Sequence, residues 1–179
     1  MVKYFEELKR SMDMLAKEPN ALFLGQAVEY DGTAMTTTLK DVPGEKKLEM
    51  PVTEELQMGA SIGLAWEGFI PISIYPRWNF LLLATNQLVN HLDKLKFMRA
   101  KPAGVIIRVG VGSQVPLHPQ HQHIGDYSDA FQYHMLETLA VYNCLEPHNI
   151  YPCYTRALER AKEGKSSIVA EFGDYYSTK

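Results

Sequence analysis

The sequence contains little cysteine: only Cys144 and Cys153 occur among 179 residues. Two cysteines provide neither the disulfide framework of a small secreted protein nor the paired spacing of a zinc site. No apolar stretch approaches the roughly 20 residues of a membrane-spanning helix. The N-terminal residues MVKYFEELKRSMDML are amphipathic and contain acids, unlike the apolar core of a signal peptide. These absences predict a cytoplasmic protein.

An excess of positive charge is also missing, since the chain has 21 acidic residues against 18 lysines and arginines, and its net charge is -3. This balance lacks the basic footprint of a protein that binds nucleic acid or an anionic membrane. With 46% hydrophobic and 22% charged residues, the composition is that of an ordinary globular protein. The length suits one core, and we expect residues 1–179 to form a single domain.

Several catalytic and phosphate-binding motifs are absent. There is no G-x-G-x-x-G after the first expected strand and no P-loop, so phosphate binding has no support from a motif. The G-x-S-x-G pattern is missing as well, and nothing presents Ser113 as a nucleophile. The sequence therefore excludes the commonest nucleotide-binding and serine-hydrolase signatures.

What the sequence does contain is an alternation of helices and strands. Phe5, Leu8, Met12 and Leu15 recur at steps of three and four, which is typical of an amphipathic helix. Thr53 is a candidate N-cap for the next helix, and Gly68 is expected to end it. The remaining pattern predicts strands at 21–25, 47–50, 69–75, 104–109, 139–145 and 167–172, helices at 53–66, 80–98, 130–137 and 151–162, and loops at 26–46 and 110–129.

The expected strands are continuous apolar runs, as in sheets that are covered on both faces. The alternation predicts an α/β fold with three layers, in which a mostly parallel sheet lies between helices. Sheets of this kind bind ligands beyond the carboxyl ends of their strands. Those positions fall in residues 25–38, 75–79 and 110–123.

A few residues in these regions are candidates for chemistry. Glu54 and Glu55 open a helix just after Pro51, where the helix dipole alone favours acids. Phe80 has the default interpretation of a core aromatic. A histidine group lies in a proline-containing loop, where it forms either a polar active-site or surface loop or a zinc site, and no cysteine or carboxylate stands beside it. Its members are His118, His121 and His123.

Three segments carry a resemblance to a known family. They are MPVTEELQMGASIGLAWEGFIPI at 50–72, YPRWNFLLLATNQLVNHLDKLKFM at 75–98 and GVIIRVGVG at 104–112. Together they resemble the transketolase-like pyrimidine-binding domain of thiamine-diphosphate-dependent enzymes, in particular the N-terminal domain of 2-oxoacid dehydrogenase beta subunits. The resemblance covers nearly the whole chain and implies the thiamine-diphosphate-binding, pyrimidine-module fold.

The resemblance also implies roles for individual residues. Glu54 matches the glutamate that hydrogen-bonds N1′ of the cofactor's aminopyrimidine ring, and Phe80 matches the aromatic residue that packs against that ring. Pro76 and Leu83 fall on other positions near the pyrimidine pocket. His121, after Gln120, matches an active-site histidine that faces the substrate. The implied catalytic residues are thus Glu54 and His121, and no metal ligand is expected in this chain.

The chemistry explains why a glutamate is needed. A carboxyl group bonded to N1′ favours the imino tautomer of the aminopyrimidine, whose nitrogen is then a local base for the thiazolium proton. Shielding from water strengthens such a hydrogen bond. The aromatic wall at Phe80 provides stacking and a low dielectric.

Two departures from the family pattern matter. The Gly-Asp-Gly and Asn-Asn motifs that hold diphosphate and magnesium in the family are absent; 125–127 and 173–175 are only fragments. The resemblance therefore implies that thiamine diphosphate is shared with a partner chain, which holds the magnesium. Gln26 stands where the family often has an acid in a proton path between active sites.

We expect a subunit of a split thiamine-diphosphate-dependent transferase or decarboxylase that is inactive alone. Its chemistry would be transketolase-like or 2-oxoacid-decarboxylating. The expected partners are a diphosphate-binding subunit and further subunits of a homo- or hetero-oligomer, with helix 55–66 as a candidate contact. The alternative, favoured by Gln26, is a non-catalytic dimerising or regulatory relative that no longer binds cofactor.

Overall fold

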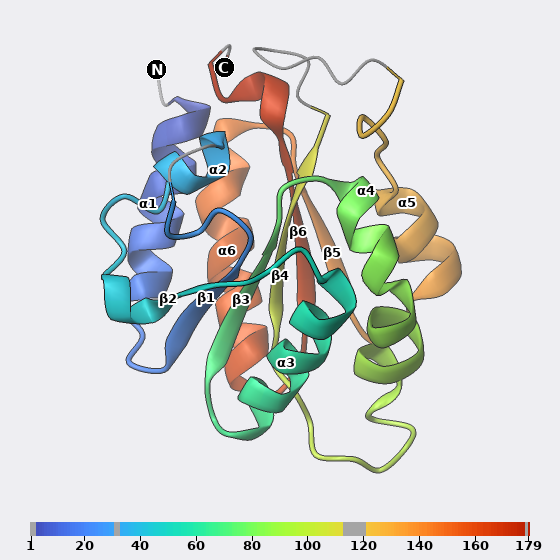
Figure 1. The fold of residues 1–179 in the computed structure, drawn as a ribbon. Coiled ribbons are helices and arrows are strands. Elements are labelled where there is room, and N and C mark those ends of the chain that lie inside the picture. The colour runs from blue at the N-terminus through green and yellow to red at the C-terminus, as the bar shows by residue number, and fades with distance from the viewer. Residues whose placement is uncertain (1–2, 31–32, 113–120, 178) are drawn as a thin grey trace.

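The computed structural model describes residues 3–30, 33–112, 121–177 and 179. A six-stranded parallel sheet in the order β2-β1-β3-β4-β6-β5 forms its centre (Figure 1). This arrangement confirms the predicted α/β fold. The strands are β1 (Ala21–Gly25), β2 (Lys47–Glu49), β3 (Ile70–Tyr75), β4 (Ile106–Val111), β5 (Ala140–Cys144) and β6 (Ser167–Phe172).

Helices cover both faces of the sheet. Helices α1 (Tyr4–Ala16) and α6 (Pro147–Lys162) lie together on one face, and α3 (Glu54–Trp66) and α4 (Trp78–Leu81) lie on the other (Figure 1). Each face of the sheet has its own buried cluster. Leu8, Met12 and Tyr154 belong to the cluster under α1 and α6. Met58 and Leu88 belong to the cluster on the α3 and α4 side. The shorter helices are α2 (Ala34–Thr37) and α5 (Ser128–Ala130), the 3₁₀ turns Gly44–Lys46 and Gly173–Tyr175, and the π-helical turn Phe131–Met135.

The helix predicted at 80–98 is not continuous, and this prediction was wrong in detail. After α4 the chain forms a 3₁₀ turn at Leu82–Ala84, a π-helical stretch at Asn86–His91 and a second 3₁₀ turn at Leu92–Lys94. A π-helical turn holds more residues than an α-helical one and shifts the side chains that follow it. Asp93 follows it and is fully buried, accepting backbone N–H groups of residues 137–139 at 2.8–3.2 Å.

Smaller differences occur at other helix ends. Thr53 precedes α3 as predicted, but its side chain makes no capping hydrogen bond and its hydroxyl instead donates to the carbonyl of Pro51 at 3.4 Å. Helix α6 begins at Pro147, four residues before the predicted start, because proline is well suited to a first helical turn. The loop predicted at 26–46 contains the short α2.

A buried ion pair joins two neighbouring strands. Arg108 of β4 and Glu171 of β6 are both fully buried, and the guanidinium donates to both carboxylate oxygens at 2.8 and 2.9 Å. The hydroxyls of Tyr154 and Tyr176 donate to the same carboxylate. Burial, and then the negative charge of Glu171, raise the pKa of both tyrosines. Four donors thus satisfy the one buried carboxylate, as a charge inside a core requires.

No helix in the described parts of the chain is both long enough and apolar enough to cross a membrane.

Candidate functional site

The strands β1, β2 and β3 end side by side, and helix α3 begins at this edge. The edge is closely packed, because a Cβ atom added at Gly25 would lie 2.5 Å from the carbonyl oxygen of Ile74. Only glycine therefore fits at the end of β1. This is the edge where a parallel sheet presents its ligand-binding residues.

Glu54 is the first residue of α3, and its side chain points inward. It is 5% exposed, whereas Glu55, the next residue, is exposed to solvent. The side-chain amide of Gln26 donates to Oε1 of Glu54 at 3.3 Å. The hydroxyl of Tyr75 donates to its backbone carbonyl at 3.4 Å. An acid that only favoured the helix terminus would lie in solvent like Glu55, so burial distinguishes Glu54 from that simpler role.

The second carboxylate oxygen of Glu54 receives no hydrogen bond from the described residues. Oε2 therefore remains available to a donor from a ligand.

Gln57 fixes this end of α3 to the sheet, a role that sequence reasoning missed. Its buried side-chain amide donates to the carbonyl of Ile74 at 2.9 Å and contacts Ser73 Oγ at 3.2 Å. Residues three apart lie on the same face of a helix. The sequence did offer a signal: Gln57, a polar residue, stands one helical turn after Glu54 and therefore lies on the same face of α3.

Glu49, also missed, organises the turn after β1. Its carboxylate accepts the backbone N–H groups of Ala27, Val28 and Glu29 at 2.6, 2.8 and 2.9 Å. Ala27 adopts a left-handed conformation with φ 53°, which is unusual for a residue with a side chain. The three hydrogen bonds hold that conformation, and they fix the backbone next to Gln26.

A second group of side chains lies beyond β3. Phe80 in α4 is half-buried, and its ring centroid lies 5.0 Å from that of His123. The Arg77 guanidinium donates to the carbonyls of His123 at 2.8 Å and Gly112 at 3.0 Å, which holds these two residues close together. His123 has φ 59°, and its Nδ1 is buried without a hydrogen-bond partner.

The other predicted residues have different surroundings. His121 is exposed, and His118 and Gln120 lie outside the described residues. Pro76 is half-buried, and its carbonyl oxygen lies 2.2 Å from where a Cβ atom on Gly110 would be. Leu83 is 59% exposed. The structure thus brings Phe80 together with His123 rather than with His121.

Eight buried side-chain polar atoms lack a hydrogen-bond partner among the described residues, and four of them belong to α4 and to residues 123–128. Trp78 Nε1, Asn79 Oδ1 and Ser128 Oγ join His123 Nδ1 in this condition. The Trp78 ring packs against Phe131 at 5.0 Å, which keeps the group together. Buried polar groups are nearly always paired with protein, water or ligand.

The zinc alternative has no support within residues 3–30, 33–112, 121–177 and 179. No three histidines, cysteines or acids there are grouped so that they could hold a metal ion. The part of the alternative that rests on His118 falls outside the described residues.

Comparison with known proteins gives relatives of one kind. The chain is 30% identical over 122 residues to a mitochondrial pyruvate dehydrogenase E1 component subunit beta of Caenorhabditis elegans, covering 65% of this chain and 35% of that protein. It is 29% identical over 115 residues to a mitochondrial 2-oxoisovalerate dehydrogenase subunit beta of Chaetomium thermophilum, covering 59% and 24%. No family model matches. The chain thus spans about a third or less of these two relatives.

Among solved structures, a split gene transketolase described as an inactive beta4 tetramer has a similar fold. The TM-score is 0.64 at 13% identity, and the match covers 96% of this chain and 51% of the other. At this identity the match shows the fold alone.

Proposed function

We propose that this chain, whose resemblance to the transketolase-like pyrimidine-binding domain is confirmed by these comparisons, is the pyrimidine-binding subunit of a split thiamine-diphosphate-dependent enzyme. The observation that carries the proposal is the buried carboxylate of Glu54. One of its oxygens accepts from Gln26, and the other has no donor among the described residues. A ring nitrogen such as N1′ of an aminopyrimidine is the kind of partner that this second oxygen lacks.

In this proposal Glu54 holds a proton between its carboxyl group and N1′, while thiamine diphosphate supplies the nucleophilic carbon for carbon–carbon bond chemistry. Burial matters because a hydrogen bond is stronger away from bulk water. Gln26 orients the carboxyl group through a neutral amide. This amide has no titratable proton of its own at neutral pH, unlike the acid that the family pattern often has at this position.

The pocket for the ring is proposed to lie beside Phe80, with Pro76 and Leu83 flanking it. The half-buried ring of Phe80 provides a stacking surface. The unpaired Nδ1 of His123, whose ring contacts that of Phe80, supports a polar ligand here. For the substrate we propose a histidine of the following loop: His121 from the family pattern, with His123 as the competing candidate because it contacts Phe80.

The cofactor's diphosphate and magnesium are proposed to be held by a partner subunit, because this chain lacks the motif for them. The reaction would be transketolase-like or 2-oxoacid-decarboxylating, with the chain inactive alone. The relatives named above are dehydrogenase beta subunits, and the similar structure is described as an inactive tetramer of beta chains; both support a subunit role.

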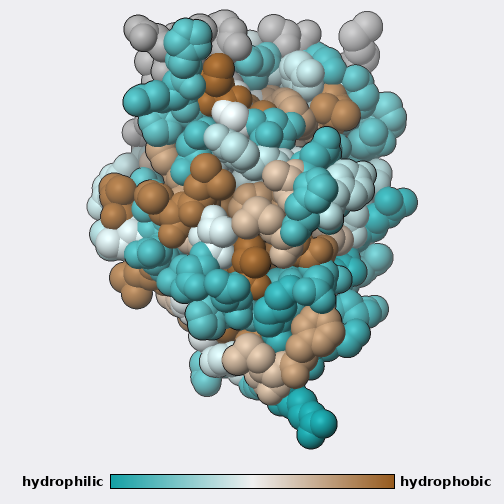
Figure 2. Space-filling model, turned by 90° about the vertical axis from the view of Figure 1, so that its right-hand side faces the viewer, coloured by the Kyte–Doolittle hydropathy of each residue, from teal (hydrophilic) through white to brown (hydrophobic). Residues whose placement is uncertain are grey.

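The partner surface is proposed to include the outer face of α3 and the helical segment after β3. Leu56 on α3 is 57% exposed, and a Cβ atom added at Gly59 or Gly63 would meet nothing within 4 Å. Small residues beside an exposed leucine allow another helix to approach closely. Figure 2 faces the side with the segment after β3 and shows several apolar patches among polar residues; Leu82, Leu83, Phe97 and Met98 of this segment are exposed.

Calorimetry with thiamine diphosphate tests the proposal. The isolated chain should bind weakly, and the complex with its co-purifying partner should bind tightly and only with magnesium. Tight, magnesium-dependent binding by the isolated chain would contradict the split site. A complex that binds no cofactor at all would instead favour the non-catalytic dimerising or regulatory relative.

A further inference from the structure

A cavity lies at the opposite end of the sheet from Glu54. It has a volume of about 320 Å³ and lies next to residues that lead into β4 and β6 at their amino ends. Glu54 stands at the carboxyl ends, so the length of the strands separates the two places. The cofactor site therefore does not account for this cavity.

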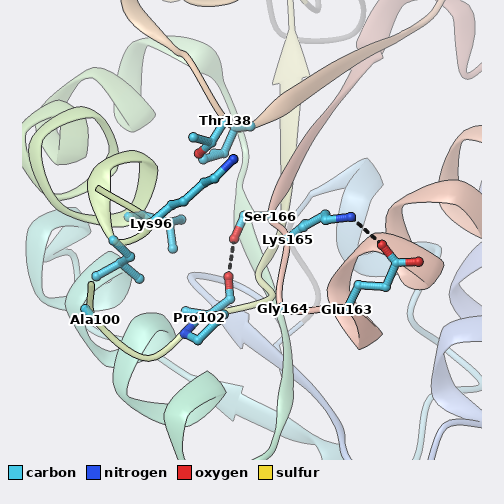
Figure 3. Close-up of a pocket in the computed structure, with 12 residues that line it drawn as sticks. Lys96, Ala100, Pro102, Thr138, Glu163, Gly164, Lys165 and Ser166 are labelled. Atoms are coloured by element: carbon cyan, nitrogen blue, oxygen red, sulfur yellow. Dashed lines mark hydrogen bonds and ion pairs between the residues drawn. The ribbon is translucent and has the colours of Figure 1, made fainter. Parts of the chain in front are cut away.

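The walls of the cavity are mainly apolar. They come from the last turns of the helical segment after β3, from the loop before β4, from the residues just before β5 and from the loop between α6 and β6 (Figure 3). A cavity with mostly apolar walls and few polar groups is the usual form of a small-molecule site. The apolar lining residues are Leu92, Leu95, Ala100, Pro102, Ala103 and Leu139.

Hydrogen bonds hold these walls in place. Ser166 Oγ donates to the carbonyl of Ala103 at 2.8 Å and accepts from the Val105 N–H at 3.0 Å. Thr138 is fixed on the other side, because its hydroxyl donates to the carbonyl of Asp93 at 2.8 Å. The cavity is thus largely formed in advance, which lowers the entropy cost of binding. The hydroxyls of Ser166 and Thr138 already form hydrogen bonds within the chain, so a ligand does not need to provide polar groups for them.

The charges around the cavity leave one ammonium group without a partner. Lys165 points toward Glu163 and pairs with it at 2.6 Å (Figure 3). Lys96 extends across the opening toward Thr138 and makes no hydrogen bond or ion pair with any residue in the described parts of the chain (Figure 3). One positive charge therefore stands beside apolar walls.

We propose that this cavity binds a small monocarboxylate, with its apolar body between Leu95 and Leu139 and its carboxylate at Lys96. An apolar body fills the walls without leaving buried polar groups unpaired. The single ammonium selects one negative charge over a neutral or positive head group. This site is separate from the proposed cofactor function and stands or falls independently of it.

Amide chemical-shift titration of the full chain tests the proposal, with hexanoate as probe and hexanol and hexylamine as matched neutral and cationic controls. Hexanoate should give saturable shifts at Leu95, Ala103 and Leu139 and none at Glu54. Hexanol should bind at least about tenfold more weakly, since it lacks the charge for Lys96. Hexylamine should not bind.

Two variants sharpen the test. Lys96→Gln should weaken hexanoate binding about tenfold or more, whereas Lys40→Gln, an exposed lysine on another loop, should leave it unchanged. Ala100→Phe should abolish binding by filling the cavity from a half-exposed loop position, where a larger residue is tolerated. Absence of saturable shifts in the folded wild-type chain would overturn the proposal. So would equal affinity for hexanol, or full affinity in both cavity variants.

Discussion

The side-chain amide of Gln26 donates to Oε1 of Glu54 across 3.3 Å, at the edge where β1 and β3 end. Gln26 begins the turn after β1, and Glu49 holds this turn by accepting the next three backbone N–H groups. Because the donor is neutral, it orients the carboxylate without adding a second acid to the site. This relationship leaves Oε2 of Glu54 without a hydrogen bond from the described residues, and in the proposed function it is the oxygen that accepts from the cofactor.

Replacing Phe80 with alanine should weaken thiamine diphosphate binding in the assembled enzyme more than it slows the reaction of bound cofactor. Loss of a stacked ring costs about 1–3 kcal/mol, which corresponds to a fall in affinity of roughly five- to 150-fold. Calorimetry gives the affinity and single-turnover kinetics the rate. Phe69→Ala, which removes an exposed phenylalanine outside both the site and the proposed partner surface, is the matched control. Unchanged affinity with reduced stability would identify Phe80 as a core residue.

The two described histidines of the loop after β4 make a discriminating pair. If His121 faces the substrate, His121→Ala should spare cofactor binding and slow single turnover, because a histidine can donate a hydrogen bond to a carboxylate or a developing alkoxide. His123→Ala should then act mainly on the Phe80 contact and on cofactor affinity. A slow turnover in the His123 variant alone would transfer the substrate role to it. Small, equal effects in both would indicate a solvent-exposed loop.

Gly59→Leu should reduce self-association or partner binding without unfolding the chain. Within the chain itself a Cβ atom at Gly59 meets nothing within 4 Å, so a leucine there does not clash with the rest of the chain and interferes only with a helix that packs against this face. Sedimentation velocity and light scattering give the assembly state. Gly44→Leu is the control, since it also has open space but lies away from α3. A wild-type chain that stays monomeric well above micromolar concentration, even with the partner, would contradict this surface.

Asp93→Asn should destabilise the fold by roughly 2–3 kcal/mol at neutral pH, because a charged acceptor of several backbone N–H groups is lost. Burial by itself pushes the pKa of Asp93 upward, but hydrogen bonds from Lys94 and from the backbone of residues 137–139 outweigh it and lower the pKa.

A carboxyl group with a lowered folded-state pKa contributes stability above its unfolded pKa and loses it as pH falls through the folded value. The stability difference between wild type and Asp93→Asn should therefore shrink in acid, below the ordinary carboxyl range. Urea denaturation across that range measures it, with the exposed Asp129→Asn as control. A difference that stays constant with pH would show that the charge of Asp93 contributes nothing.

Much of the fold could be predicted because its strands are unbroken apolar runs. The predictions for β1 and β6 match the observed strands residue for residue. The segment after β3 was predicted less well, since π-helical turns have no distinct residue pattern and depend on where Asp93 finds its donors. Arg108 was read as part of an apolar strand, because its partner Glu171 is 63 residues away.

In the candidate site, too, the residue set by a local motif was predicted, and the residues that act through distant contacts were not. The position of Glu54 followed from a local motif, and the structure adds its burial. Gln57 and Glu49 act through contacts with other strands, so their roles could not be read from neighbouring residues. The choice between His121 and His123 depends on the path of a loop without periodicity. The cavity at the amino ends of β4 and β6 is formed by three segments that are far apart in the sequence, 92–103, 138–139 and 163–166, so no local pattern predicts it.

The most direct test of the central claim is hydrogen–deuterium exchange of the thiazolium proton of thiamine diphosphate, followed by NMR in the assembled complex. Glu54→Gln keeps the shape of the side chain but cannot supply a proton to N1′. Exchange should fall by several orders of magnitude in this variant, since the activating step itself is removed, while Glu55→Gln, its exposed neighbour, should behave like wild type. Wild-type exchange in a folded, cofactor-bound Glu54→Gln complex would contradict the account, because Glu54 would then be only an acid at a helix terminus.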